Sequence, residues 1–183
     1  GFTHEPAVVL AEKLLQKLPS NQSKIFYSDN GSTAVEVALK MAYQYCQLLG
    51  KKEKKTFLRL KNAYHGDTMG AVSVGGMDLF HKVYRDLVIP TILVEFPDFY
   101  RCPQGKSYPG YTLECLKKLE SLLKRRHDAM AAFIIEPLVQ AAAGMIVWPK
   151  GILKRISRLC RKYDVLLIAD EVATGMGRTG KMF

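Results

Sequence analysis

An apolar run ends abruptly in two carboxylates in the segment Leu166-Leu167-Ile168-Ala169-Asp170-Glu171-Val172. Residues 165–169 are continuously apolar and β-branched at Val165 and Ile168, a pattern that predicts a short buried parallel strand. Open α/β sheets bind ligands at the carboxyl ends of their strands, which is where Asp170 falls. Because an unpaired buried charge is costly, Asp170 needs a partner. Spacing alone leaves two interpretations open: Asp170 contacts the protonated ring nitrogen of a bound cofactor, or it caps the following turn.

Strand and helix patterns alternate along the whole chain. Helices are predicted over residues 5–18, 34–50, 69–74, 77–85, 112–127 and 149–163, and strands over residues 24–28, 56–60, 91–94, 131–135 and 165–169. Thr33 and Glu36 have the spacing of a capping box at the start of the second helix. Residues 95–111 and 139–149 are predicted to be loops. This alternation predicts an α/β fold with a mostly parallel sheet and helices on both faces.

Composition and charge are compatible with one domain that has a sizeable core. The chain has 183 residues, and its net charge of +10 comes from 27 basic and 17 acidic side chains. The basic residues cluster at 51–55, 117–118, 124–126 and 154–162. These clusters fall on predicted helix faces and helix ends, and no RNA- or DNA-binding motif accompanies them. The pattern therefore favours a solvated surface over a nucleic-acid contact.

Cysteine spacing and hydropathy narrow the class further. The four cysteines form no C-x-x-C pair, so we expect no metal site and reduced thiols in a cytoplasmic protein. No apolar run approaches transmembrane length, and no signal peptide is visible, so we expect no membrane partner. The chain starts at Gly1 without a methionine and stops at Phe183, and we expect it to be a piece of a longer protein.

A candidate phosphate site lies at Asp29-Asn30-Gly31-Ser32-Thr33, between a predicted strand and a predicted helix. Gly31 allows close approach of the backbone, the first helical N–H groups are unpaired, and the helix dipole favours an anion there. Ser32 and Thr33 add hydroxyl donors. The alternative is an ordinary helix N-cap. A Walker A motif is excluded, because no Gly-Lys-Ser/Thr follows.

Gly175-x-Gly177-x-x-Gly180 matches the dinucleotide-binding fingerprint only in its letters. The fingerprint should open a helix directly after a strand, whereas five residues separate these glycines from the predicted strand. We therefore expect a flexible glycine-rich loop that carries Arg178. That side chain either meets an anionic substrate group or caps a turn.

Three residues after other predicted strands add chemistry to the same sheet edge. Tyr64 could stack on a flat cofactor ring, an arrangement that adds about 0.5–1.5 kcal/mol to burial, or pack within its loop. His65 beside it is more often structural than catalytic in such a place. Glu136 either orients other groups of the site or is satisfied at the rim by backbone N–H groups. Taken together, a phosphate cradle, an aromatic plate and a buried acid fit pyridoxal phosphate, whose ring accepts electrons while its nitrogen stays protonated.

Four motifs resemble those of class III pyridoxal-phosphate aminotransferases: Phe26-x-x-x-Asn30-Gly31-Ser32, Tyr64-His65-Gly66-Asp67-Thr68, Ile135-Glu136-Pro137 and Asp170-Glu171-Val172-x-Thr174-Gly175-x-Gly177-Arg178-Thr179-Gly180. They occur in the family's order and cover essentially the whole chain. The resemblance implies the large domain of a fold-type I transferase, a three-layer αβα architecture, with residues 1–183 as a single domain forming its central part. Within the class, segments 32–38, 64–68 and 134–145 are most similar to the branch that aminates 8-amino-7-oxononanoate in biotin biosynthesis.

The resemblance also implies roles for individual residues. Gly31 and Ser32 would hold the cofactor phosphate, and Tyr64 would stack on the ring and line the substrate site. Asp170 would bind the pyridine nitrogen, and Val172 would pack on the other face of the ring. Arg178 would serve the substrate side, with His65 and Glu136 in supporting positions.

What the chain lacks limits what it is expected to do alone. No lysine matches the family's Schiff-base lysine, which we expect beyond Phe183 together with the small C-terminal domain, so no catalytic residue is assigned and the isolated chain should be inactive. The parent enzyme would be a cytoplasmic homodimer that moves nitrogen from S-adenosylmethionine to 8-amino-7-oxononanoate, giving 7,8-diaminononanoate. The alternatives are another class III ω-aminotransferase, acting on ornithine or 4-aminobutyrate, and a non-catalytic fragment.

Overall fold

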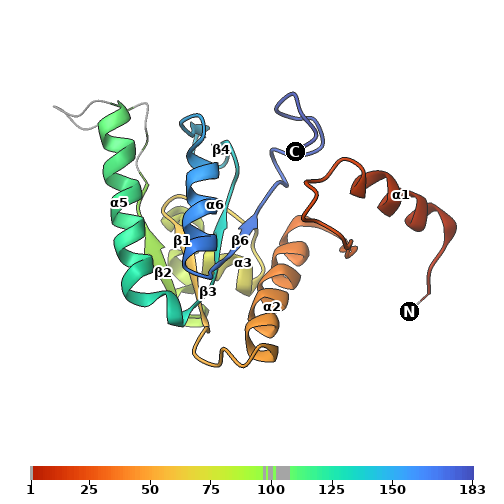
Figure 1. The fold of residues 1–183 in the computed structure, drawn as a ribbon, viewed down its shortest axis with the longest axis horizontal. Helices are drawn as coiled ribbons and strands as arrows, with labels where there is room; N and C mark the ends of the chain where they lie inside the picture. The colour runs from red at the N-terminus through yellow and green to blue at the C-terminus, as the bar shows by residue number, and fades with distance from the viewer. Residues whose placement is uncertain (1, 97, 99–100, 102–107) are drawn as a thin grey trace.

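A four-stranded parallel sheet forms the centre of the computed structural model, which describes residues 2–96, 98, 101 and 108–183 (Figure 1). Its strands are β1 (Thr56–Leu60), β2 (Thr91–Val94), β3 (Met130–Ile135) and β6 (Leu166–Ala169), in the order β2-β1-β3-β6. Each neighbouring pair is parallel, which confirms the predicted sheet type. The carboxyl ends of β1, β3 and β6 therefore meet at one edge.

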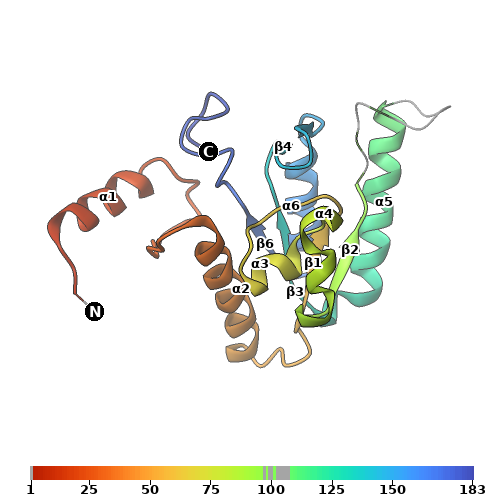
Figure 2. The same cartoon turned by 180° about the vertical axis from the view of Figure 1, so that it is seen from behind.

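Helices cover both faces of the sheet (Figures 1 and 2). One face carries α2 (Gly31–Leu48) and α3 (Met69–Val74), and the other carries α5 (Tyr108–Arg126) and α6 (Ile152–Lys162). The remaining helices are α1 (Glu5–Leu15), α4 (Asp78–His81), η1 (Lys82–Leu87) and η2 (His127–Ala129). α1 projects away from these layers and buries none of its side chains. None of the helices in the described ranges combines the length and hydropathy needed for a membrane crossing.

β3 is buried along its whole length and separates two hydrophobic cores. Phe133 belongs to the core that includes Leu119 of α5 and Ile156 of α6. Ile134, the next residue, points to the other face and belongs to the core that includes Leu39 of α2. Full burial of one such side chain stabilises the fold by about 1.5–3 kcal/mol. The continuous apolar run that predicted a strand here follows from this two-sided burial.

Lys54 holds the amino edge of the sheet together. Its side chain is buried, and Nζ donates to the carbonyl oxygens of His127 at 2.8 Å, Met130 at 3.3 Å and Asp164 at 2.6 Å. The carboxylate of Asp164 lies 3.6 Å from the same ammonium. The three donors of a lysine are thus matched by three carbonyl groups from the connections that lead into β3 and β6.

Two predicted elements differ in the structure. Residues 24–28 were predicted to be a strand but form no regular structure, because no neighbouring strand within the described residues offers them hydrogen bonds. Residues 139–149 were predicted to be a loop but contain a small antiparallel pair, β4 (Val139–Gln140) and β5 (Ile146–Val147). Strands of two residues are too short for their alternation to be recognised.

Helix boundaries show smaller differences. The predicted helix at 77–85 is split into α4 and the 3-10 helix η1. The capping box at the start of α2 joins Asn30 to Thr33, so the predicted Thr33–Glu36 box is wrong. Glu36 instead accepts hydrogen bonds from the N–H groups of Gly70 at 2.6 Å and Ala71 at 3.3 Å, and thereby caps α3.

Candidate functional site

Asp170 lies at the carboxyl end of β6 and is almost fully buried. Its Oδ1 accepts from the N–H of Val172 at 3.1 Å, and its Oδ2 lies 2.6 Å from Nδ1 of His65. A carboxylate that carries no proton only accepts hydrogen bonds, so the tautomer of His65 that pairs with such a group is the one with its proton on Nδ1. Both side chains are at least 95% inaccessible to solvent, at 5% exposure for Asp170 and 0% for His65. The buried acid predicted from the strand end therefore has a partner, but its oxygens retain lone pairs for another donor.

The amino end of α2 faces the same region. Asn30 Oδ1 accepts from the Thr33 N–H at 3.0 Å, and the Thr33 hydroxyl accepts from the Asn30 N–H at 3.3 Å. Gly31 and Ser32 occupy the first turn, where intrahelical carbonyl groups cannot reach the N–H groups. These donors and the dipole of an 18-residue helix form a site that favours an anion.

The loop after β1 packs directly onto this helix end. Gly66 has a φ of +116°, and a Cβ atom added there would collide with the side chain of Ser32. Only glycine satisfies both the backbone conformation and the close approach. The loop that carries Tyr64 and His65 is consequently fixed against the predicted phosphate cradle.

Hydrogen bonds of Tyr64 and Glu136 join the loop after β1 to the segment after β3 beside the cavity. The Tyr64 hydroxyl donates to Asp67 Oδ2 at 2.7 Å, and this bond is the main reason that the pKa of Tyr64 is raised. Glu136 accepts from the N–H groups of Tyr64 at 3.2 Å and Ala141 at 3.0 Å. Burial raises the pKa of the Glu136 carboxyl, and these two N–H donors oppose the shift.

These groups surround a cavity of about 630 Å³. It is lined by residues 30–32, 64–68, 136, 141–142, 170 and 172–173. The predicted residues that line it are Gly31, Ser32, Tyr64, His65, Glu136, Asp170 and Val172. Arg178 does not line it; this residue is exposed in the turns after β6, and its contact with a substrate stays a prediction. The glycines around Arg178 open no helix, in keeping with the rejected dinucleotide fingerprint.

Asp67 and Thr68 belong to the motif at residues 64–68, but no role was predicted for either of them. Asp67 is the hydrogen-bond partner of Tyr64, and its position three residues later in the same loop was the available signal. The hydroxyl of Thr68 and Nε2 of His65 are buried without a hydrogen-bond partner within the described part of the chain. Such atoms are rare in folded proteins, and both belong to residues that line the cavity.

The arrangement fits a flat, anionic, protonated ring. The first turn of α2 can bind a phosphate group. The carboxylate of Asp170 can accept a hydrogen bond from a protonated ring nitrogen. Val172 is 71% exposed on the cavity wall and offers an apolar face. Its side chain also leaves no free space at Gly31, where an added Cβ atom would lie 3.0 Å from a Val172 methyl carbon. The residues present therefore suit pyridoxal phosphate.

Comparison with known proteins gives the family. The model of the class III aminotransferases matches residues 1–183, so the chain belongs to this family. Its members use pyridoxal phosphate, and the cofactor expected from the site is thereby supported by sequence.

Individual relatives narrow the similarity. Over 100% of the chain, the sequence is 54% identical to an adenosylmethionine-8-amino-7-oxononanoate aminotransferase from Geobacter sulfurreducens and 51% identical to one from Staphylococcus aureus. A crystal structure of the enzyme of that name from Methanocaldococcus jannaschii superposes with a TM-score of 0.89 at 40% identity. A pyridoxal-phosphate-bound amine transaminase from an uncultivated Pseudomonas species superposes with 0.90 at 38% identity. The fold-type I architecture is thus confirmed.

The chain spans only part of these proteins. It covers 41% of the Geobacter and Staphylococcus relatives, 39% of the Methanocaldococcus structure and 42% of the Pseudomonas structure.

Proposed function

We propose that the whole protein transfers an amino group from S-adenosylmethionine to the ketone of 8-amino-7-oxononanoate, forming 7,8-diaminononanoate. The observation that carries the proposal is the buried Asp170 at the end of β6, which faces the amino end of α2 across one cavity. The relatives support the substrate, because those that match the entire chain at 40–54% identity bear the name of this reaction.

Five residues of this chain would hold the cofactor. Gly31 and Ser32 bind its phosphate with N–H and hydroxyl groups, Tyr64 and Val172 pack on the two faces of the ring, and Asp170 accepts the hydrogen bond of the ring nitrogen. When bound, pyridoxal phosphate supplies an electron-accepting ring that stabilises negative charge on the carbon next to the amine. Asp170 would make this possible by keeping a proton on the ring nitrogen, and the burial of its side chain strengthens the contact.

Three further residues would support the site. His65 orients Asp170 through the 2.6 Å contact. Glu136 fixes the backbone of Tyr64 and of Ala141, and so sets the width of the cavity. Arg178 would meet a substrate group on the exposed side. We assign the cofactor-bonding lysine to a part of the whole protein outside residues 1–183, which we take as the central part of the large domain.

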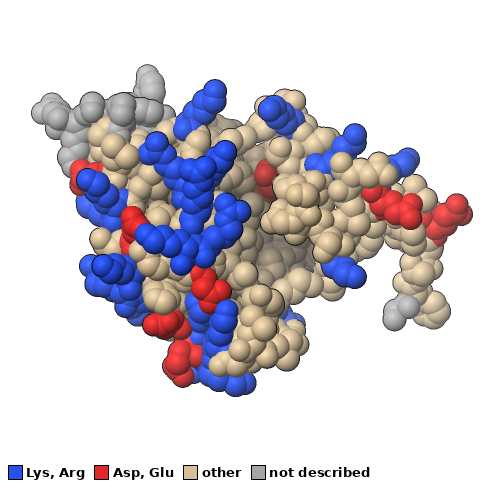
Figure 3. All heavy atoms as spheres, in the orientation of Figure 1, with Lys and Arg blue, Asp and Glu red and all other residues tan. Residues whose placement is uncertain are grey.

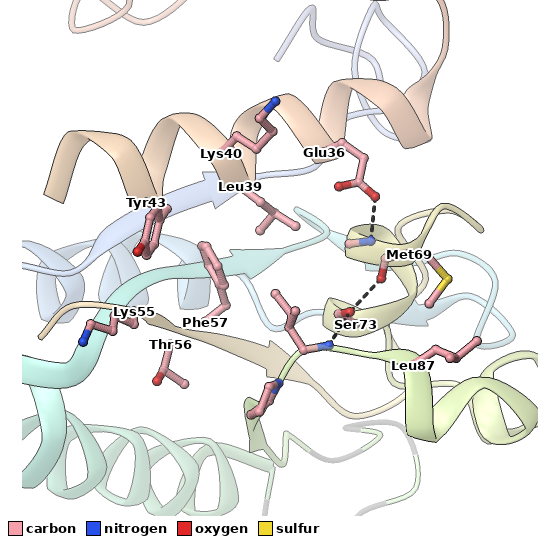
Figure 4. Close-up of a pocket in the computed structure, with 13 residues that line it drawn as sticks. Glu36, Leu39, Lys40, Tyr43, Lys55, Thr56, Phe57, Met69, Ser73 and Leu87 are labelled. Carbon is pink, nitrogen blue, oxygen red and sulfur yellow. Dashed lines mark hydrogen bonds between the residues drawn. The ribbon is translucent and has the colours of Figure 1, made fainter. Parts of the chain in front are cut away.

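A homodimer is part of the proposal, and an apolar face around α2 and α3 supports it. A hollow of about 580 Å³ lies beside these helices, and Leu39, Tyr43, Met69 and Leu87 are among the residues that line it (Figure 4). Tyr43, Met69, Leu87 and Ile89 remain 42–68% exposed. An apolar area of this kind commonly marks a protein interface. Light scattering of the whole protein with Leu87→Glu should show a monomer where the parent protein is a dimer.

The cellular site proposed for the enzyme is the cytoplasm. Cys46, Cys115 and Cys160 are buried free thiols, a state that suits a reducing compartment.

The absorption spectrum of the whole protein with pyridoxal phosphate tests the proposal. Addition of S-adenosylmethionine without acceptor should remove the visible absorption of the bound cofactor, and later addition of 8-amino-7-oxononanoate should restore it and release 7,8-diaminononanoate. If the spectrum changes with ornithine or 4-aminobutyrate instead, the protein is still an aminotransferase, but the proposed substrates are wrong. If the protein binds no pyridoxal phosphate, the proposed function is wrong and Asp170 has only a structural role.

A further inference from the structure

The face formed by α5 and α6 carries most of the excess positive charge. The two helices together have ten basic and two acidic side chains, a net charge of +8, compared with +10 for the whole chain. Figure 3 shows lysine and arginine side chains gathered on one face of the molecule, with several acidic side chains beside them. The 2.6 Å ion pair from Lys162 to Glu120 shows that the two helices lie side by side.

α6 contributes a continuous cationic stripe. Its 11 residues include five cations and no acid: Lys154, Arg155, Arg158, Arg161 and Lys162. Residues three and four apart share one helix face, so all five lie on the same side. All are exposed, whereas the opposite side of the helix buries Ile152, Ile156 and Cys160 in the core.

Favourable local electrostatics do not account for this stripe. Arg161 and Lys162 in the last turn are stabilised by the helix dipole, but Lys154 and Arg155 lie near the amino end, where the dipole disfavours cations. Like charges four residues apart, such as Lys154 and Arg158, also destabilise a helix. Within the described residues, only Lys162 of the five has an ion pair. The stripe therefore carries an electrostatic cost that the isolated molecule does not offset.

From this cost we propose that the stripe on α6, extended by the basic end of α5, binds a linear phosphate polyanion such as a nucleic-acid backbone. Three of the five cations are arginines, whose planar donors suit phosphate oxygens. The sequence alone favoured a solvated surface. The observation that changes this preference is that Lys154 and Arg155, at the amino end of α6, have no ion pair within the described residues.

The lack of apolar groups in the stripe argues against the other partners of a basic surface. The apolar side chains of α6 are buried or half-buried. A helix that enters a membrane surface presents apolar groups beside its cations, and a protein interface usually has an apolar or aromatic centre. Binding to phosphate groups alone requires no apolar side chains in the stripe, and it does not depend on base sequence.

The experiment uses the whole protein with its cofactor. Fluorescence polarisation is measured with labelled duplex DNA, labelled RNA and, by competition, inorganic polyphosphate, at about 50 to 200 mM salt. The triple variant Arg155→Glu/Arg158→Glu/Arg161→Glu should bind at least about tenfold more weakly, and the slope of log K against log salt should fall in magnitude by about 2 to 3. The three probes identify the source of the phosphate.

The matched control is Lys13→Glu/Lys17→Glu/Lys24→Glu, which changes net charge equally at exposed positions outside the face. It should retain most of the binding, and circular dichroism and turnover should show both variants folded and active. No binding to any of the three probes, an equal loss in the control, or binding only to phosphatidylserine vesicles or to an acidic peptide would overturn the proposal. None of these outcomes bears on the transaminase activity.

Discussion

The two edges of the sheet differ in how completely their buried polar groups are hydrogen-bonded. At the amino edge, three carbonyl groups match the three donors of Lys54. At the carboxyl edge, Asp170 retains accepting capacity, and Nε2 of His65 and the hydroxyl of Thr68 have no partner in the described ranges. A buried polar group whose hydrogen bonds are all made within the protein stabilises the fold. A buried polar group with a free donor or acceptor can instead form a hydrogen bond with a ligand. The first edge therefore serves the fold, and the second has the free hydrogen-bonding atoms that the proposed cofactor site requires.

The largest expected effect is on activity at the carboxyl edge. Asp170→Asn removes the charge that, in the proposed function, would keep the ring nitrogen protonated, and it retains the size of the side chain. Turnover of the whole protein should fall by on the order of 10²-fold or more, with a small change in thermal stability. Steady-state kinetics and a thermal melt measure the two effects. If stability fell and turnover per folded molecule did not, Asp170 would be structural and the contrast between the edges would fail.

Lys54→Met should show the reverse at the amino edge. It leaves one buried and two partly buried carbonyl groups without their donor, so the free energy of unfolding should drop by about 3 kcal/mol, whereas turnover per folded molecule should be unchanged. Urea unfolding provides the measurement. Lys55→Met, at an exposed neighbour, is the control and should cost less than about 0.5 kcal/mol.

Gly66→Ala tests whether the loop and the end of α2 form one unit. The new methyl group collides with Ser32 and requires an unfavourable backbone conformation. Affinity for pyridoxal phosphate should fall by about tenfold, which corresponds to ~1.4 kcal/mol. Gly50→Ala separates the two causes, because Gly50 also has a positive φ of +75° but open space around it. Equal losses of cofactor affinity in both variants would show that the close contact of Gly66 with Ser32 is not what supports cofactor binding.

The smallest effects concern pH and have opposite signs at the two edges. Burial raises the pKa of Glu136, so its stabilising contribution is present at low pH and is lost as pH rises through the shifted pKa. The Lys51 hydrogen bond lowers the pKa of Asp164, so its contribution is present above the ordinary carboxyl range and is lost as pH falls through the lowered value.

Glu136→Gln and Asp164→Asn isolate these two contributions. The stability deficit of Glu136→Gln relative to the parent should shrink as pH rises, and that of Asp164→Asn should grow to about 0.5 kcal/mol. Urea unfolding across the acidic to neutral range distinguishes them. Parallel pH profiles for the two variants would contradict the assignment.

The sequence allowed the architecture to be predicted because burial leaves a local pattern. Strands β1, β2, β3 and β6 were all found from short apolar runs, and α2 and α5 from their periods. Residues 24–28 have an equally good strand pattern, but a strand also requires a neighbour, which no local pattern contains. The pairing of His65 with Asp170, 105 residues apart, was hidden for the same reason. The motifs named residues that the fold brings around one cavity, and only the fold showed how they pair.

Lys54 also has a consequence for the order of folding. Its hydrogen bonds join segments separated by 73 to 110 residues, so the set is complete only when the segments that lead into β3 and β6 are both in place. Contacts that form late in folding mainly control how fast the native state opens. In a chevron plot, Lys54→Met should therefore raise the unfolding rate and leave the refolding rate nearly unchanged. A faster unfolding rate with an unchanged refolding rate would show that the hydrogen bonds of Lys54 form after the rate-limiting step of folding.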